Sequence, residues 1–177
     1  AALDLVEKAM ASDEDLLYVV AIGAITNVAS AILLKPEIID RIVVIWLGGQ
    51  PLYWPSARHF NLGQDLQASR LVFDCGVPLV HVPCDTVTSH LLTSAPEMEY
   101  YLQGQGAIGD YLLEIFKRFI DTHAVMGKEL WDISTLAYLI NPDWVPTELV
   151  HSPILTDQMT WSVDRSRHLI RQATSVR

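Results

Sequence analysis

Cysteine is scarce in this sequence, which has only Cys75 and Cys84 among its 177 residues, neither of them in a Cys-x-x-Cys pair. Two thiols are too few for a disulfide framework, so we expect both to be buried and reduced, which predicts a cytoplasmic location. Four histidines show no metal-site spacing: His81, His90, His151 and His168. A disulfide-rich secreted domain is therefore excluded.

Long apolar runs and an excess of basic residues are also missing. The longest apolar run, residues 16–25, has the length of a strand and falls short of the ~18 residues needed to cross a bilayer. The formal net charge is −9, from 21 acidic and 12 basic residues, so a phosphate backbone would be repelled at long range. The sequence therefore predicts neither a membrane nor a nucleic acid as a partner.

Charged residues are few for a chain of this size, at 19%, and the mean hydropathy is +0.24. A chain of 177 residues can bury a sizeable core in one domain, and we read residues 1–177 as a single domain. The low charge predicts that further surface is buried against another part of the same protein or against a second subunit. A homo-oligomer is the expectation.

Several well-known catalytic and phosphate-binding motifs are absent. There is no Gly-x-Gly-x-x-Gly after the first predicted strand, no P-loop, no His-Glu-x-x-His and no nucleophile elbow. Dinucleotide binding and serine-hydrolase chemistry of the nucleophile-elbow kind therefore have no support in the sequence.

The first half of the chain alternates between strand-like and helix-like periods. Short connections between these segments predict an α/β fold with an open, mostly parallel sheet, right-handed crossovers and flanking helices. The first strand reads as covered on both faces, because it is apolar throughout. The strands are expected at 16–22, 42–47 and 78–82, and the helices at 2–10, at 66–75 and between a cap at Thr26 or Asn27 and Lys35.

The second half has a different character. Residues 107–124 show the spacing of an amphipathic helix, and residues 133–140 that of a helix ended by Asn141-Pro142. Short β-like runs follow at 149–155, 159–163 and 168–170, which predicts an antiparallel edge to the sheet near the carboxyl terminus.

Polar and glycine-rich segments follow the predicted strands, where open parallel sheets bind their ligands. They are Ile22-Gly23, Leu47-Gly48-Gly49 and Val82-Pro83-Cys84-Asp85.

Asn61 either stabilises a turn through its own backbone or offers an amide to vicinal hydroxyls. His59 stands two residues earlier, so in an extended segment both side chains would point the same way. His59 is otherwise an exposed loop histidine.

Three further residues have two readings each. Asp132 precedes an apolar helix, and is either its N-cap or a hard-cation ligand that needs partners, because calcium takes about 6–8 oxygens. His123 is a helix C-terminal cap or a contact to a leaving group. Trp131 is a packing residue or part of a pocket wall.

The order of these features resembles the inosine-uridine preferring nucleoside hydrolases. Residues 21–29 (Ala-Ile-Gly-Ala-Ile-Thr-Asn-Val-Ala) resemble the family's segment of a strand, a glycine, a Leu-Thr-Asn and a helix. The sequence His59-Phe60-Asn61 resembles its Glu-Phe-Asn sugar-binding motif, and Leu130-Trp131-Asp132 its His-Asp helix. The similarity covers nearly the whole chain in one order.

The resemblance implies calcium-dependent hydrolysis of the N-glycosidic bond of a ribonucleoside. It implies that Asp132 and the backbone oxygen of Ile22 are calcium ligands, and that Asn61, His59 and Leu47 contact the ribose. Trp131 and His123 would then line the site beside the leaving base. The chain departs from the family pattern where His59 replaces an acidic residue and where Trp131 replaces the histidine associated with nucleobase protonation.

The family's first strand ends in an aspartate-rich cluster, and the only early acidic cluster here, Asp13-Glu14-Asp15, precedes a strand. We therefore expect the chain to be the carboxyl-terminal part of a longer domain, inactive alone. One alternative is a non-catalytic member that binds a sugar, a nucleoside or a protein partner. Another is an unrelated α/β domain, which predicts that Ile22, Asn61 and Asp132 do not converge.

Overall fold

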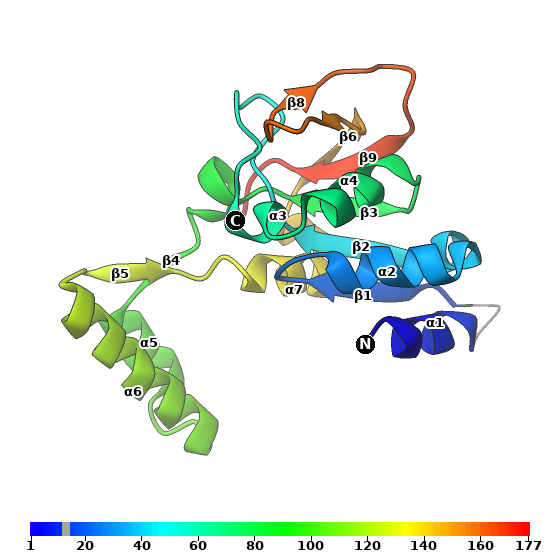
Figure 1. Cartoon of the computed structure of the whole chain (residues 1–177). Helices are drawn as coiled ribbons and strands as arrows, with labels where there is room; N and C mark the ends of the chain where they lie inside the picture. The colour runs from blue at the N-terminus through cyan, green and yellow to red at the C-terminus, as the bar shows by residue number, and fades with distance from the viewer. Residues whose placement is uncertain (12–14) are drawn as a thin grey trace.

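The computed structural model describes residues 1–11 and 15–177, so Asp13 and Glu14 of the early acidic cluster lie outside the described residues. A five-stranded sheet in the order β1-β2-β3-β9-β6 forms the centre (Figure 1). Strands β1, β2, β3 and β9 are parallel, and β6 is antiparallel to β9. The sheet is made of β1 (Leu17–Ala21), β2 (Ile42–Leu47), β3 (Leu79–Val82), β6 (Thr147–His151) and β9 (Leu169–Ala173). The α/β class with an antiparallel edge is thereby confirmed.

Helices cover the two faces of this sheet. Successive side chains of a strand point to opposite faces of the sheet, so each face has its own core. Val44 and Trp46 of β2 belong to one core, and Ile45 and Leu47 belong to the other. The first core is closed by α1 (Ala2–Met10), α2 (Thr26–Leu34) and α4 (Leu66–Asp74), and the second mainly by α7 (Ile133–Ile140). These helices and β2 lie within a residue or two of their predicted positions.

Strand β1 fits its prediction only in part. Its side chains pack against a core on each face, as expected, but none of them is fully buried, and the strand forms an edge of the sheet because it pairs with β2 alone among the described strands. The exposed fraction of Tyr18 is 51%. The apolar composition of this strand therefore reflects partial cover by α1 and α7 rather than full burial.

The predicted cap of α2 is also wrong. Its N-cap position is Ile25, which makes no side-chain capping bond, and Thr26 is the first helical residue. The hydroxyl of Thr26 instead donates to the carboxylate of Asp65, at 2.7 Å. Asp65 is the N-cap of α4 and also accepts from the backbone N–H of Ala68. The hydrogen bonds from Thr26 and Ala68 lower the pKa of Asp65, and they tie α2 to the start of α4.

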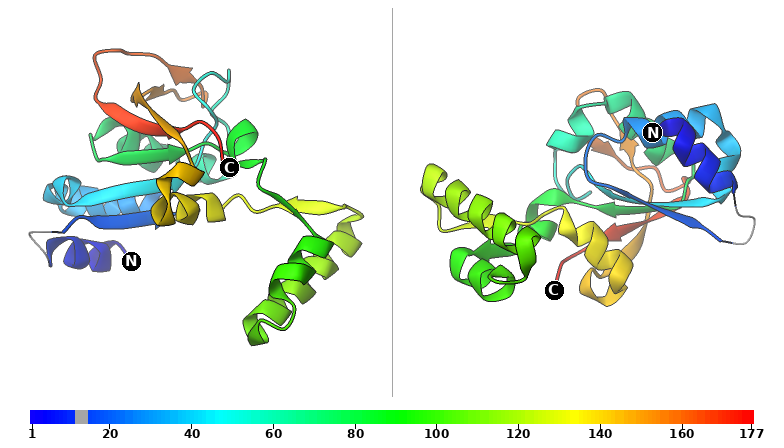
Figure 2. Two further views of the ribbon diagram at one scale, coloured as in Figure 1. Left: turned by 180° about the vertical axis from the view of Figure 1, so that it is seen from behind. Right: turned by 90° about the horizontal axis from the view of Figure 1, so that it is seen from below.

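A helical hairpin projects from the body of the molecule (Figures 1 and 2). It consists of α5 (Ala95–Leu102) and α6 (Gly106–His123), joined to the sheet by the two-stranded ribbon of β4 (Leu92–Ser94) and β5 (Gly127–Glu129). A capping box of Ser94 and Glu97 starts α5. Apolar side chains remain open along the hairpin, with Ile108 77% exposed.

The remaining elements are short. They are α3 (Phe60–Gly63), the β7–β8 ribbon (Ile154–Leu155 with Trp161–Ser162), the 3₁₀ turns Pro36–Asp40 and Pro142–Trp144, and a turn at Cys84–Thr88. Both cysteines are free; Cys84 is buried as expected and Cys75 is half-buried. Within the described ranges, no helix is both long and apolar enough to cross a bilayer.

Candidate functional site

A tight turn at the carboxyl end of β2, Gly48-Gly49, forms the floor of the candidate site. A Cβ atom at Gly48 would clash with the indole ring of Trp46, and one at Gly49 would lie 2.9 Å from Leu62 Cδ1. Gly49 also has a φ of +76°, which side-chain-bearing residues rarely adopt. Glycine at these positions therefore allows the backbone to bend within a fully packed environment.

Asn61 connects the carboxyl ends of β1 and β2. Its amide Nδ2 donates to the carbonyl oxygens of Leu47, at 2.8 Å, and Ile22, at 3.2 Å. Asn61 is buried in α3, so the expected extended segment is wrong and the amide does not stabilise its own turn. Since both N–H groups point to carbonyls, its Oδ1 is left as an acceptor. Three of the predicted site residues thus meet at one place.

His59 precedes this helix as the N-cap residue of α3, in an extended backbone conformation. Its ring is half-buried, and Nδ1 makes no hydrogen bond within the described chain. Burial lowers the pKa of His59, and the carboxylates of Asp85 and Asp132 partly offset this effect. The imidazole is therefore neutral at pH 7, and Asp132 lies close enough on the same edge of the sheet to act on it electrostatically.

Asp132 occupies the N-cap position of α7, but its side chain makes no capping hydrogen bond. The carboxylate is exposed, while the helix that follows packs on the second core. The capping interpretation of this residue is therefore not supported by a hydrogen bond. Asp132, His59 and the Asn61 cluster share the edge of the sheet at which the parallel strands end.

A side-chain clamp joins the loops after β2 and β3. Gln50 donates from Nε2 to the carboxylate of Asp85 and accepts from the backbone N–H of Asp85 at 3.0 Å. Gln50 Nε2 also donates to the carbonyl of Arg58, the residue before His59. Thr86 has a φ of +64°, and its hydroxyl lies 2.6 Å from the Tyr53 hydroxyl. The clamp fixes the approach of the chain to His59.

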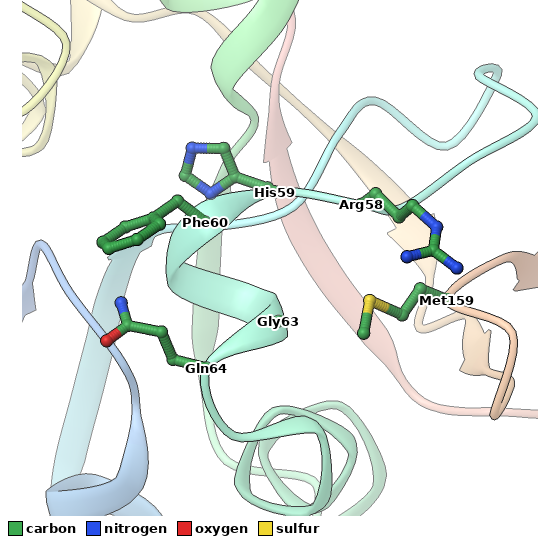
Figure 3. Close-up of a pocket in the computed structure, with 6 residues that line it drawn as sticks. All are labelled: Arg58, His59, Phe60, Gly63, Gln64 and Met159. Carbon is green, nitrogen blue, oxygen red and sulfur yellow. The ribbon is translucent and has the colours of Figure 1, made fainter.

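A shallow, open hollow of about 520 Å³ surrounds the start of α3 (Figure 3). The rings of His59 and Phe60 lie on one side of the helix, and Arg58 and Met159 lie on the other. Gln64 and Gly63 complete the lining. His59 is the predicted site residue that lines this hollow, while Asn61 and Leu47 are buried and do not line it.

Trp131 and His123 have different surroundings. Trp131 is half-buried against the second core, and the centroid of its ring lies 5.5 Å from Lys128 Nζ. The indole Nε1 has no hydrogen-bond acceptor among the described residues. The imidazole of His123 donates from Nδ1 to the backbone carbonyl of Phe119. It also stacks on the Phe119 ring, with 4.2 Å between the ring centroids. His123 ends α6, which extends away from the sheet in Figures 1 and 2, so the site role of His123 stays a prediction.

Metal-binding groups are sparse. Among the described residues, no group of three or more histidine, cysteine, aspartate or glutamate side chains could hold a metal ion. Calcium requires about 6–8 oxygen ligands. Asp132 and the carbonyl of Ile22 are therefore too few by themselves to bind calcium, and the latter oxygen already accepts from Asn61.

Comparisons with known proteins give a consistent result. The family model of the inosine-uridine preferring nucleoside hydrolases matches residues 1–176. The pyrimidine-specific ribonucleoside hydrolase RihB of Escherichia coli K12 is 30% identical over 152 residues, which are 81% of this chain and 48% of RihB. The nucleoside hydrolase structure from Bacillus anthracis superposes with a TM-score of 0.78 at 16% identity, covering 99% of this chain and 60% of that one.

A further structural neighbour is the type III effector XopQ, solved with adenosine diphosphate ribose. Its TM-score is 0.65 at 15% identity, over 96% of this chain and 57% of XopQ. The chain thus spans about half to three fifths of the length of these relatives.

Proposed function

The chain belongs to the inosine-uridine preferring nucleoside hydrolase family, and from this premise we propose that the complete protein hydrolyses the N-glycosidic bond of a ribonucleoside. The observation that carries the proposal is the meeting of Asn61 with the carbonyls of Ile22 and Leu47 at the ends of two parallel strands. Ligands of open parallel sheets bind at this edge.

Asn61 is proposed to bind the ribose. With both N–H groups engaged by carbonyls, Asn61 Oδ1 is available to accept a hydrogen bond from a sugar hydroxyl. His59 is proposed to contact the sugar as a neutral ring, because burial keeps its pKa below the ordinary value. A neutral imidazole cannot stabilise the positive charge of an oxocarbenium-like transition state as a carboxylate can. Leu47, Trp131 and His123 complete the proposed substrate contacts.

Calcium is the proposed cofactor of the complete protein. Asp132 and the Ile22 carbonyl would supply part of its oxygen ligands, and when bound the ion would supply an activated water. Other parts of the complete protein must then supply the remaining ligands. This accords with the chain being the carboxyl-terminal part of a longer domain, and we propose that the 177-residue chain alone is inactive.

A cytoplasmic, homo-oligomeric protein is proposed for the complete chain. The scarcity of cysteine supports the location, and the apolar surface of α6 supports the assembly.

The direct test is an assay of the complete protein against a panel of purine and pyrimidine ribonucleosides, with and without a chelator. We expect release of free base that stops when the metal is removed. Asp132→Ala is expected to abolish calcium binding in calorimetry, because it removes a ligand carboxylate. Asp157→Ala is the matched control, since this exposed carboxylate pairs with Arg70 and is not one of the proposed metal ligands. Unchanged calcium affinity in Asp132→Ala would refute the metal assignment.

A second candidate is a non-catalytic binding module for a sugar, a nucleoside or a protein. His59 and Trp131 favour it, because they replace the family's acidic and proton-donating residues. The XopQ structure is a complex with adenosine diphosphate ribose, and this compound is a suitable ribosyl probe for the present protein. Calorimetric binding of that compound with no release of base from any nucleoside would favour the binding module over the hydrolase.

A further inference from the structure

His81 is fully buried beneath the Gly48-Gly49 turn and has no role in the chemistry proposed above. It lies on β3 in one row across the sheet, between Trp46 on β2 and Gln172 on β9. Side chains in such a row project from the same face of the sheet. His81 Nε2 lies 2.6 Å from the carbonyl oxygen of Gly48. Because a carbonyl only accepts, Nε2 must carry the hydrogen and donate it.

This contact is what orients the imidazole. In the described part of the chain, His81 Nδ1 has no hydrogen-bond partner, so Nε2 makes the polar contact that sets the ring tautomer. Burial lowers the pKa of His81 to about 4, which keeps the ring neutral with a single N–H. The ring edge also packs against Phe73, at 5.4 Å between centroids.

Aromatic rings also pack around the turn. Trp161 packs against Phe73 at 5.3 Å and lies 6.0 Å from His81 between ring centroids. A Cβ atom added at Gly49 would lie 3.2 Å from Trp161 Cζ2. The rings of Trp46 and Trp161 therefore crowd the two glycines, and His81 supplies a hydrogen bond to the same turn.

The same turn carries the groups of the candidate site. The Leu47 carbonyl, one residue before Gly48, accepts from Asn61, and the Gly49 carbonyl accepts from the backbone N–H of Cys84 at 3.1 Å. A shift of the Gly48 peptide would move the Leu47 carbonyl and with it the Asn61 amide. His81 is linked to Asn61 through this short stretch of backbone.

We propose that His81 is a positioning residue of the candidate site: its hydrogen bond to Gly48 fixes the turn that holds Leu47 against Asn61. The consequence for substrate binding rests on the proposed function, whereas the effect on Asn61 can be observed without any activity. His81 itself touches no substrate.

Two amide substitutions separate the hydrogen bond from mere packing. Glutamine places its amide nitrogen as many bonds from Cβ as the histidine Nε2, so His81→Gln can keep the bond to Gly48. Asparagine places its amide at the position of Nδ1, so His81→Asn loses that bond while remaining polar. His168→Asn is the matched control, since His168 is half-buried and directly precedes β9, at the amino ends of the parallel strands and away from the turn at their carboxyl ends.

The first readout is the side-chain amide of Asn61 in the complete protein. Only three asparagines occur in the 177 residues, Asn27, Asn61 and Asn141, so selective ¹⁵N-asparagine labelling gives few signals from this part. The Asn61 signal is assigned by its loss in Asn61→Asp. We expect His81→Asn to shift it and His81→Gln and His168→Asn to leave it in place. An unmoved Asn61 signal in folded His81→Asn would overturn the proposal.

The second readout is kinetic, with a ribonucleoside turned over by the wild-type protein. His81→Asn is expected to raise KM about tenfold with a smaller effect on kcat, because ribose contacts are displaced, and His81→Gln should restore KM. Equal damage in both variants would overturn the proposal, because it would indicate packing alone. If the wild type cleaves no nucleoside, the proposed function fails, and the Asn61 signal still decides the role of His81.

The ring tautomer of His81 can be measured in the wild-type protein even if His81→Asn does not fold. In that case the ¹⁵N shifts of the wild-type imidazole and the spectrum of His81→Gln test the proposal. A hydrogen on Nε2 together with an unmoved Asn61 signal in His81→Gln supports the proposal. A hydrogen on Nδ1 overturns it, because Gly48 would then receive no hydrogen bond.

Discussion

At the scale of single residues, Asn61 shows how one side chain can join two strands. Its amide satisfies the carbonyls of Ile22 and Leu47, which have left the sheet's own hydrogen-bond ladder. A buried carbonyl without a donor costs free energy, so a polar side chain in this place stabilises the fold even before any ligand is bound. The structural role of Asn61 and its proposed ligand-binding role therefore fall on the same side chain.

Asn61→Ala should lower the unfolding free energy of the complete protein by about 1–3 kcal/mol, because it leaves the buried carbonyl of Leu47 unpaired. The measurement is the urea midpoint with an unchanged m-value. Exposed Asn27→Ala is the control and should change stability by less than about 0.5 kcal/mol. Equal stability in the two variants would show that the Asn61 bonds contribute nothing.

A second prediction at this scale concerns the unfolding free energy at acidic pH. The pKa of His81 is lowered from 6.5 to about 4 by burial, so the folded state binds its proton less readily than the unfolded state does. The buried neutral ring makes its full contribution to the unfolding free energy above pH 6.5. This contribution, about 3 kcal/mol, is lost as the pH falls from 6.5 to 4. As pH falls through this range, the wild type should therefore lose about 3 kcal/mol more unfolding free energy than His81→Gln, which has no imidazole at this position. Parallel curves would contradict it.

At the scale of elements, Asp65 caps α4 and binds the first residue of α2. The carboxylate accepts from the Ala68 backbone N–H at 3.0 Å and from the Thr26 hydroxyl at 2.7 Å. Two helices on one face of the sheet thus begin from a common point. This point lies directly after α3, so it also limits how far the Asn61 helix can move.

Asp65→Ala should destabilise the protein by about 1–2 kcal/mol through loss of the cap. Asp65→Asn keeps an acceptor oxygen and should recover most of that stability, as measured by chemical denaturation. If the two variants are equally destabilised, the charge rather than the cap is responsible.

The elements also show what could be predicted from the sequence. The strand at 42–47 and the helix at 133–140 were predicted correctly, because their apolar patterns are continuous and their ends carry glycine or proline. The exposure of β1 was missed, since burial depends on its place in the strand order and not on its composition. The hydrogen bonds of Asp85 and His81 could not be predicted, because their partners, Gln50 and Gly48, come from distant parts of the chain.

At the scale of the whole molecule, the projecting hairpin leaves apolar side chains exposed to solvent. Tyr100 is 81% exposed and Ile108 is 77% exposed, on helices that pack mainly against each other. Exposed apolar surface favours association with other protein surfaces.

The complete protein should therefore sediment as a homo-oligomer, and Ile108→Lys should shift it toward the monomer, because a charge would be placed in an apolar contact. Light scattering after size-exclusion chromatography gives the mass of each. Leu3→Lys, on the exposed face of α1, is the control. A monomeric wild type would refute the assembly.

The crowding around Gly48 and Gly49 also bears on how this site can be re-engineered. Any side chain at the first position collides with an indole, and the second has a backbone angle that few residues tolerate. Saturation libraries should hold both codons constant and randomise Arg58, Phe60 and Gln64, whose side chains border open space. Libraries that vary Gly48 or Gly49 would mostly yield proteins that do not fold.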